Sequence, residues 1–108
     1  MVTVIVDAEN VRRSRWPNIS PPRLVELVRA WADAEGHEPL VVFDGRGPEE
    51  AGDIVGTGPE SADDWIAREA ARFAPYWLVT SDRELRERAG GGAERIVGGG
   101  AFAGTIQR

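Results

Sequence analysis

Residues 76–85 read YWLVTSDREL, an apolar run and a threonine followed by a polar segment that carries the acid Asp82. The apolar run shows no polar alternation, which is typical of a parallel strand buried on both faces. Ser81 and Glu84 have the spacing of a capping box and predict a helix over about 81–89. The stretch therefore predicts one strand–helix unit, with Asp82 just beyond the carboxyl end of the strand.

Two further apolar runs have the same form, VTVIV at about 2–6 and PLVVF at 39–43. Both predict buried strands, because their apolar residues are continuous. The proline that opens the second run is tolerated at the first position of a strand. Asp7 directly follows the first run, and Asp44 directly follows the second. Each predicted strand therefore ends at an acid, as in the first stretch.

Helix signals fill the segments between these strands. Ser20 and Ser61 stand where N-caps are expected, and Gly36 ends the first helix. Weaker apolar patches at 54–55 and 95–97 predict short strands, the first of them at an edge. Strand and helix alternate throughout, so the sequence predicts an α/β fold in three layers. Its centre is expected to be a mostly parallel sheet of four to five short strands flanked by helices.

Composition limits the chemistry. The chain has 108 residues, which suit one domain over 1–108, and its 42% hydrophobic and 29% charged residues are those of an ordinary globular protein. Its apolar runs fall well short of the roughly 20 residues that cross a bilayer, and no charged leader precedes the first, so we expect a cytoplasmic protein. The absence of cysteine and lysine excludes thiolate metal sites, Walker P-loops and Schiff-base enzymes. Carboxylates remain as the metal ligands.

The three strand-end aspartates form the candidate site. Carboxyl ends of parallel strands share one edge of a sheet, where ligands of open α/β sheets bind. A single aspartate there is often only a turn or cap former, but three together repel one another unless a cation offsets their charge. Mg²⁺ or Mn²⁺ prefers oxygen ligands and activates water, so the pattern predicts metal-assisted hydrolysis. Asp63 is a fourth candidate, because Asp64 is better explained as a capping residue of the second helix.

Five segments resemble, in this order, the NYN branch of PIN-like ribonucleases, which includes YacP-like proteins: VIVDAEN, VVFDGR, ESADDWI, LVTSDREL and VGGGAF. The resemblance covers nearly the whole chain, and VTSDREL is its most specific part. It implies a PIN-like fold and an endoribonuclease that depends on magnesium or manganese. It also implies that the acidic metal site comprises Asp7, Asp44, Asp63 and Asp82, with Asp64 as a possible further ligand. Asn10 would steady Asp7 or the scissile phosphate.

The net charge of −5 is unusual for a protein that binds nucleic acid. Four of the negative charges belong to the aspartates above, so a bound ion would offset part of them. Candidate RNA contacts are the arginines near those aspartates, namely Arg12, Arg13, Arg15, Arg46 and Arg83. Single-stranded RNA is the expected substrate. Basic residues are scarce between Asp44 and Glu60, so further contacts with the RNA could come from a ribosome partner or from the second subunit of a homodimer.

Two other functions fit the same residues. A catalytically silent RNA- or ribosome-binding module would keep the fold but lack substrate grip. A metal-dependent phosphatase ranks last, because the common phosphotransferase pattern needs a second aspartate two residues after Asp7, and that position is Glu9. Glu9 could be a peripheral metal ligand or, as we favour, a solvated residue.

Four features are interpreted as structural. Residues 7–20 are expected to form a polar loop, in which Trp16 packs against the protein rather than stacking on a base. His37 is expected at the surface near a helix end. The glycine triplets at 90–92 and 98–100 are expected to form turns.

Overall fold

The computed structural model describes all residues, 1–108, around a five-stranded sheet. The strands are β1 Thr3–Asp7, β2 Glu38–Phe43, β3 Ile54–Gly56, β4 Tyr76–Val79 and β5 Arg95–Val97. They lie in the order β3-β2-β1-β4-β5, and every neighbouring pair is parallel. The predicted central sheet of short strands is confirmed, with β1 at its middle.

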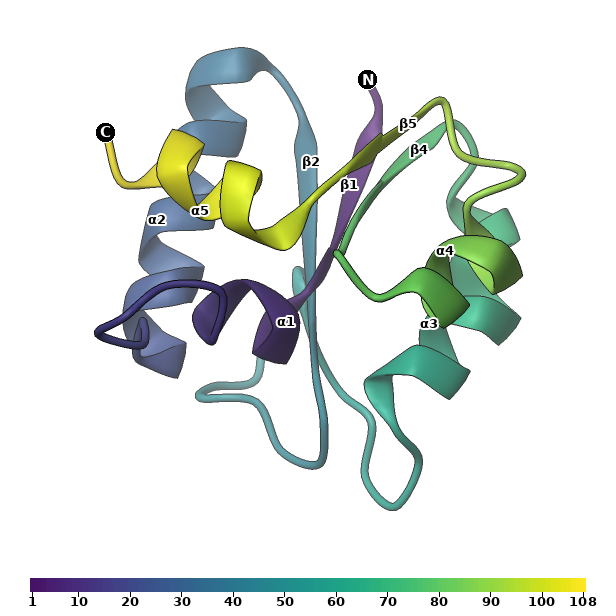
Figure 1. The fold of residues 1–108 in the computed structure, drawn as a ribbon, viewed down its shortest axis with the longest axis horizontal. Helices are drawn as coiled ribbons and strands as arrows, with labels where there is room; N and C mark the ends of the chain where they lie inside the picture. The colour runs from purple at the N-terminus through teal and green to yellow at the C-terminus, as the bar shows by residue number, and fades with distance from the viewer.

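Helices cover both faces of the sheet, as predicted (Figure 1). One face carries α1 Ala8–Arg12, α2 Pro21–Glu35 and α5 Gly99–Ile106, and the other carries α3 Ala62–Glu69, the short 3₁₀ helix η1 Ala70–Phe73, and α4 Arg83–Ala89. Each face has its own hydrophobic core, because alternate residues of the buried strands point to opposite sides. None of the helices is long and apolar enough to cross a bilayer.

The first long helix, α2, begins and ends as its sequence indicates. Ser20 Oγ accepts a hydrogen bond from the backbone N–H of Arg23, and Pro21 occupies the first turn, where its missing N–H is not needed. Gly36 ends the helix with a φ of 73°, a left-handed conformation that favours glycine. The helix packs Leu24 and Val28 into the core.

The start of α4 differs from the predicted capping box. The N-cap is Asp82, whose carboxylate accepts from the backbone N–H of Leu85 at 3.1 Å. Ser81 Oγ instead accepts from the backbone N–H of Gly99 at 2.8 Å. Aspartate and serine cap helices about equally well, so local preference does not decide between them. The contact with Gly99 occupies Ser81 and moves the helix start one residue along the chain.

Two segments predicted as irregular are helical. Residues 8–12 form α1, which places the fully buried Val11 in the core. The second segment is α5. The glycine triplet at 98–100 was expected to form a turn, but Gly98 is the N-cap of this helix. Phe102 and Ile106 lie buried one turn apart. Because glycine disfavours helix interiors, the triplet argues against a helix even though the apolar residues that follow it have helical spacing.

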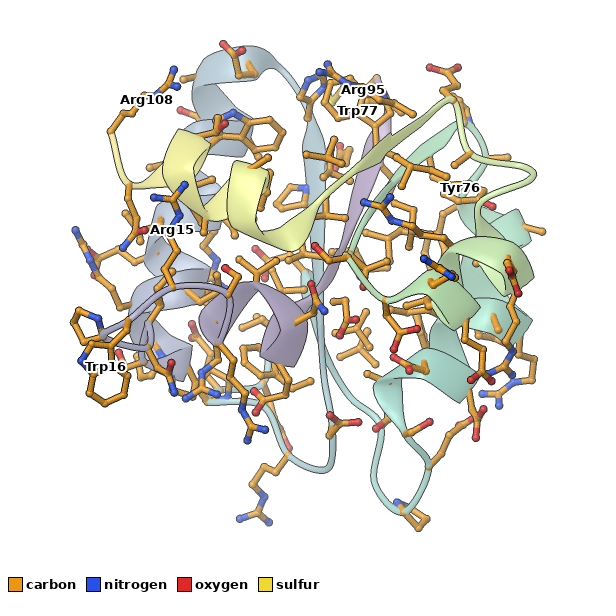
Figure 2. The ribbon with its side chains drawn as sticks, viewed as in Figure 1. Arg15, Trp16, Tyr76, Trp77, Arg95 and Arg108 are labelled. Atoms are coloured by element: carbon orange, nitrogen blue, oxygen red, sulfur yellow. The ribbon has the colours of Figure 1, made fainter.

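His37 lies near a helix end, as predicted, but it is less exposed than expected. Its ring lies 5.4 Å from the Trp31 ring and 4.6 Å from the Trp77 ring, between centroids, and the side chain is half-buried. The turn at Gly36 folds the chain back so that His37 contacts the helix it has just left. Arg95 lies over the other tryptophan, Trp77, at the top of Figure 2. This aromatic cluster lies near the amino ends of the strands, away from the predicted site.

Candidate functional site

The centre of the site is Asp7, the last residue of β1. Val6 pairs with Val79 in the sheet, so the next residues along the two strands, Asp7 and Thr80, lie side by side. Thr80 is fully buried, and its hydroxyl donates to Asp7 Oδ2 at 2.8 Å. The same hydroxyl oxygen accepts from the backbone N–H of Asp82 at 3.1 Å. Thr80 therefore connects the ends of β1 and β4.

Asp44 and Asp63 approach the same place from β2 and α3. Asp44 directly follows β2, and its Oδ1 accepts from the backbone N–H of Ala62 at 2.7 Å. This bond fixes the start of α3 next to the end of β2, so that Asp63 falls in the first turn beside the cleft. The predicted convergence at the carboxyl edge of the sheet is therefore seen in the geometry.

All four aspartates line one open cleft of about 580 Å³, and no hydrophobic side chain lines it. The remaining lining residues are Glu9, Asn10, Arg13, Ser14, Ser81 and Gly100. They come from α1 and the loop after it, the β4–α4 connection and α5. The two segments that the sequence did not predict as helices thus form one wall of the site.

Burial and neighbouring negative charges disfavour the ionised forms of Asp7 and Asp63. The pKa of Asp7 is raised from 3.8 to about 6: burial is the largest cause, the Thr80 hydrogen bond opposes it, and the charges of Asp63, Asp44 and Asp82 add to it. Burial also raises the pKa of Asp63, together with the charges of Asp82 and Asp44. The cluster therefore favours the binding of protons or cations.

The donor chemistry fits a hard divalent cation, although the ligand set is not preassembled. Carboxylate oxygens are what Mg²⁺ and Mn²⁺ prefer. As the side chains stand, no three acidic or histidine residues form a group that could hold one ion. Asp7, Asp44 and Asp82 each use one oxygen in the hydrogen bonds above and keep a second one. Metal binding by this set would require rotation of the side chains.

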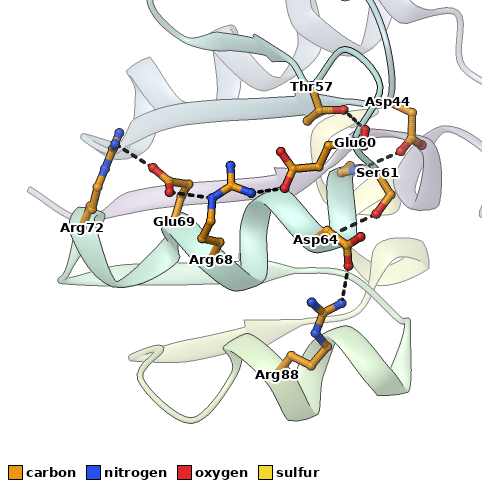
Figure 3. Close-up of polar contacts among 10 residues, drawn as sticks. Asp44, Thr57, Glu60, Ser61, Asp64, Arg68, Glu69, Arg72 and Arg88 are labelled. Atoms are coloured by element: carbon orange, nitrogen blue, oxygen red, sulfur yellow. Dashed lines mark hydrogen bonds and ion pairs between the residues drawn. The ribbon is translucent and has the colours of Figure 1, made fainter.

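The side chains of Asn10 and Asp64 contact neither Asp7 nor a shared ligand set. Asn10 Oδ1 accepts from the backbone N–H of Ser81 at 2.9 Å and packs against Gly99, whereas the hydroxyl of Thr80 holds Asp7. Asp64 does not line the cleft: its backbone N–H donates to Ser61 Oγ, as expected of a capped first turn. Its carboxylate forms an ion pair at 2.9 Å with Arg88 of α4, which connects α3 to that neighbouring helix, as Figure 3 shows.

The five predicted RNA contacts differ in accessibility. The Arg12 side chain is only 16% exposed and is bound by Glu9, which also pairs with Arg13 at 3.2 Å. Glu9 is therefore neither a free ligand nor simply solvated. Arg13 is 69% exposed and lines the cleft. The remaining three, Arg15, Arg46 and Arg83, are exposed and have no acidic partner within ion-pair distance.

Sequence reasoning missed Thr80 as a member of the site. Its signal is a hydroxyl at the end of an otherwise apolar strand, two residues before Asp82. A threonine at a strand end is usual on propensity alone, so only the register of β1 and β4 reveals its contact with Asp7.

Comparison with known proteins bears on the fold. No protein-family model and no curated protein matches this sequence. A solved structure does: the crystal structure of Rae1 (YacP) from Bacillus subtilis matches with a TM-score of 0.74 and 22% sequence identity. The match covers 98% of this chain and 76% of that chain. At this identity the likeness concerns architecture, and this chain therefore has a PIN-like, YacP-like α/β fold.

Proposed function

We propose that the protein is a metal-dependent endoribonuclease that hydrolyses RNA phosphodiester bonds in the aspartate-lined cleft. The observation that carries this proposal is Asp7, a buried carboxylate whose pKa is raised to about 6 and which faces three further aspartates. Burial and like charges cost stability, and folds tolerate such costs mainly at functional sites. The resemblance of the sequence to NYN ribonucleases supports RNA as the substrate.

The ligands of the metal would be Asp7, Asp44, Asp63 and Asp82. A bound Mg²⁺ or Mn²⁺ would offset their repulsion and supply Lewis acidity toward a phosphate oxygen and an attacking water. The chain itself supplies position. Thr80 fixes Asp7, and the bond from Asp44 to the N–H of Ala62 keeps α3 against β2.

The other cleft residues suit binding of the phosphate backbone. Arg13 is the basic residue of the cleft, and its exposed guanidinium can contact a phosphate next to the carboxylates. Asn10 holds the backbone of Ser81, so it maintains the wall of the cleft and is a positioning residue. Both lie on the α1 side of the site.

A second candidate is a catalytically silent RNA- or ribosome-binding module. Two observations favour it: the carboxylates are not preassembled around one ion, and Glu9 partly neutralises Arg13. In this case the acidic cleft would no longer catalyse hydrolysis, and the exposed arginines would bind the RNA. Partners such as the ribosome would then supply affinity.

One assay separates these functions. The purified chain is incubated with a 5′-labelled single-stranded RNA of about 30 nucleotides, in Mn²⁺, in Mg²⁺ and in chelator. A nuclease gives internal cleavage that chelator abolishes and that Asp7→Asn removes. Asp33→Asn is the matched control, because Asp33 is an exposed aspartate on α2 outside the cleft. Binding without cleavage in either metal would overturn the nuclease proposal in favour of the silent module.

A further inference from the structure

Trp16 is 88% exposed in the loop between α1 and α2. The prediction that it packs against the protein is therefore wrong. The other exposed large apolar residues are Met1, at the chain start, and Ile96, on the edge strand β5. An indole buries a large apolar area when it finds a partner, so full exposure forgoes substantial stabilisation. An exposed tryptophan in an otherwise polar loop indicates a contact surface.

The loop that carries Trp16 is fixed by contacts on both sides. Ile19 is buried, and its backbone N–H donates to the carbonyl of Arg12 at 3.0 Å, which closes the loop. Ser14 Oγ donates to the carbonyl of Val11 at 2.7 Å. Arg15 Nε donates to the carbonyl of Gly100 at 3.2 Å and so anchors the loop to α5. A partner that contacts Trp16 would therefore meet a preformed surface with little ordering cost.

Charge indicates what that partner is. The hydrogen-bond partner of Arg15 is the neutral carbonyl of Gly100, and no carboxylate lies within ion-pair distance of its guanidinium. In Figure 2 Arg15 lies over α5 and Trp16 projects from the edge of the loop. The residues that precede them, Arg13 and Ser14, line the cleft. An exposed indole and, next to it in the chain, a cation without an acidic partner suit a base and a neighbouring phosphate of one strand.

We infer that Arg15 and Trp16 form a nucleotide subsite outside the cleft for single-stranded RNA, in which Trp16 stacks on a base and Arg15 contacts a phosphate. This inference rests on the proposed function, because it takes the strand to continue from the cleft past Arg13. Single strands suit the site, since their bases are free to stack on an aromatic ring. The subsite would supply contacts with the RNA that the short loop between β2 and β3 does not.

Binding is measured with the parent chain by fluorescence anisotropy of a labelled 12-nucleotide uridine RNA in chelator, so that cleavage does not interfere. Trp16→Ala should weaken binding about tenfold, the typical loss for one base stacked on an aromatic ring, and Trp16→Phe should retain most of the affinity. Arg108→Ala is the matched control for Arg15→Ala, because Arg108 is an exposed arginine at the chain end with no acidic partner.

The salt dependence separates the two residues. Arg15→Ala should flatten the slope of log K against log salt by about 0.7, the contribution of one phosphate contact on a single strand, while Trp16→Ala should leave the slope unchanged. Equal affinity of Trp16→Ala and the parent, or no RNA binding by the parent, would overturn the inference. So would a Trp16→Ala variant whose only change is loss of a dimer in sedimentation, which would assign the indole to a second copy of the chain.

The outcomes also distinguish this inference from the proposed function. Binding that depends on Trp16, in a protein that cleaves no RNA in Mn²⁺, supports the subsite and removes the nuclease. Cleavage that depends on Asp7, with binding indifferent to Trp16, supports the nuclease and removes the subsite.

Discussion

Thr80 donates its hydroxyl hydrogen to Asp7 at 2.8 Å, and this bond opposes the burial and like charges that together leave the pKa of Asp7 raised to about 6. Thr80→Val keeps the shape of the side chain and removes the donor, so the pKa of Asp7 should rise further. A buried charged group without its hydrogen bond costs roughly 1–3 kcal/mol or more, and we expect a loss of this size in urea unfolding at pH 7.5. At pH 4, where Asp7 is protonated, the loss should be smaller.

Thr80→Ser is the control, because it retains the hydroxyl. If the protein cleaves RNA, the acidic limb of the rate–pH profile should move to higher pH in Thr80→Val and stay in place in Thr80→Ser. Equal profiles for the two variants would show that the hydroxyl does not act on Asp7.

Asp7 should make the metal-free protein less stable as pH rises. Its folded pKa of about 6 lies above its ordinary value of 3.8, so the folded state holds the proton more tightly than the unfolded state. The resulting stability is present below pH 3.8 and is lost as pH rises through 6, by about 3 kcal/mol for the two-unit shift. Asp7→Asn should thus be more stable than the parent at pH 7.5 in chelator, and the difference should vanish near pH 4.

Manganese should reverse that order. A ligand that binds only the folded state adds about 4.1 kcal/mol at a thousandfold excess over its Kd, which exceeds the loss of about 3 kcal/mol from the ionised Asp7. The parent should gain this in thermal melts at pH 7.5, and Asp7→Asn should gain much less. Equal shifts in the two proteins would mean that Asp7 does not bind the metal.

Adjacent residues on α3 give a matched pair. Asp63 lines the cleft, whereas Asp64 lies outside it and pairs with Arg88 of α4. Asp63→Asn should abolish metal-dependent cleavage, or lower it by about two orders of magnitude or more, a magnitude usual for lost groups that act on the transition state. Asp64→Asn loses only an exposed ion pair, worth roughly 0–1 kcal/mol, and should cleave like the parent. Similar rates for both variants would exclude Asp63 from the site.

The sheet and the acidic cluster could be predicted because their signals are local. Buried parallel strands have continuous apolar runs, and an acid directly after such a run must lie at the carboxyl edge. The wall formed by α1 and α5 could not be predicted in this way. Helix α1 has only five residues, of which Ala8 and Val11 are buried, and α5 begins with glycines that disfavour helix. Their stability comes from tertiary packing.

The same distinction holds for individual side chains. The position of Asp7 follows from the strand that it ends, but its bond to Thr80 depends on strand register, and the bond of Ser81 to Gly99 depends on a helix 18 residues away. Trp16 shows the opposite case: packing against the protein was expected for this tryptophan, and only the folded loop shows that nothing covers it.

Gly99 should be sensitive to the smallest substitution. A Cβ at this position would overlap Oδ1 of Asn10, which accepts the N–H of Ser81, so Gly99→Ala must displace a side chain that supports the cleft. Overpacking of this kind costs about 1–3 kcal/mol in unfolding free energy. Gly91→Ala is the matched control, because a Cβ there meets nothing within 4 Å.

A double-mutant cycle identifies the contact responsible. Asn10→Ala removes the atom with which the new methyl group collides, so the combined variant with Gly99→Ala should be more stable than the sum of the two single losses predicts, by about 0.5–3 kcal/mol. If the two losses simply add, the methyl group is accommodated by movement of α5 and Asn10 does not fix that helix. The stability of the double variant thus measures how tightly α1 and α5 are coupled at the wall of the cleft.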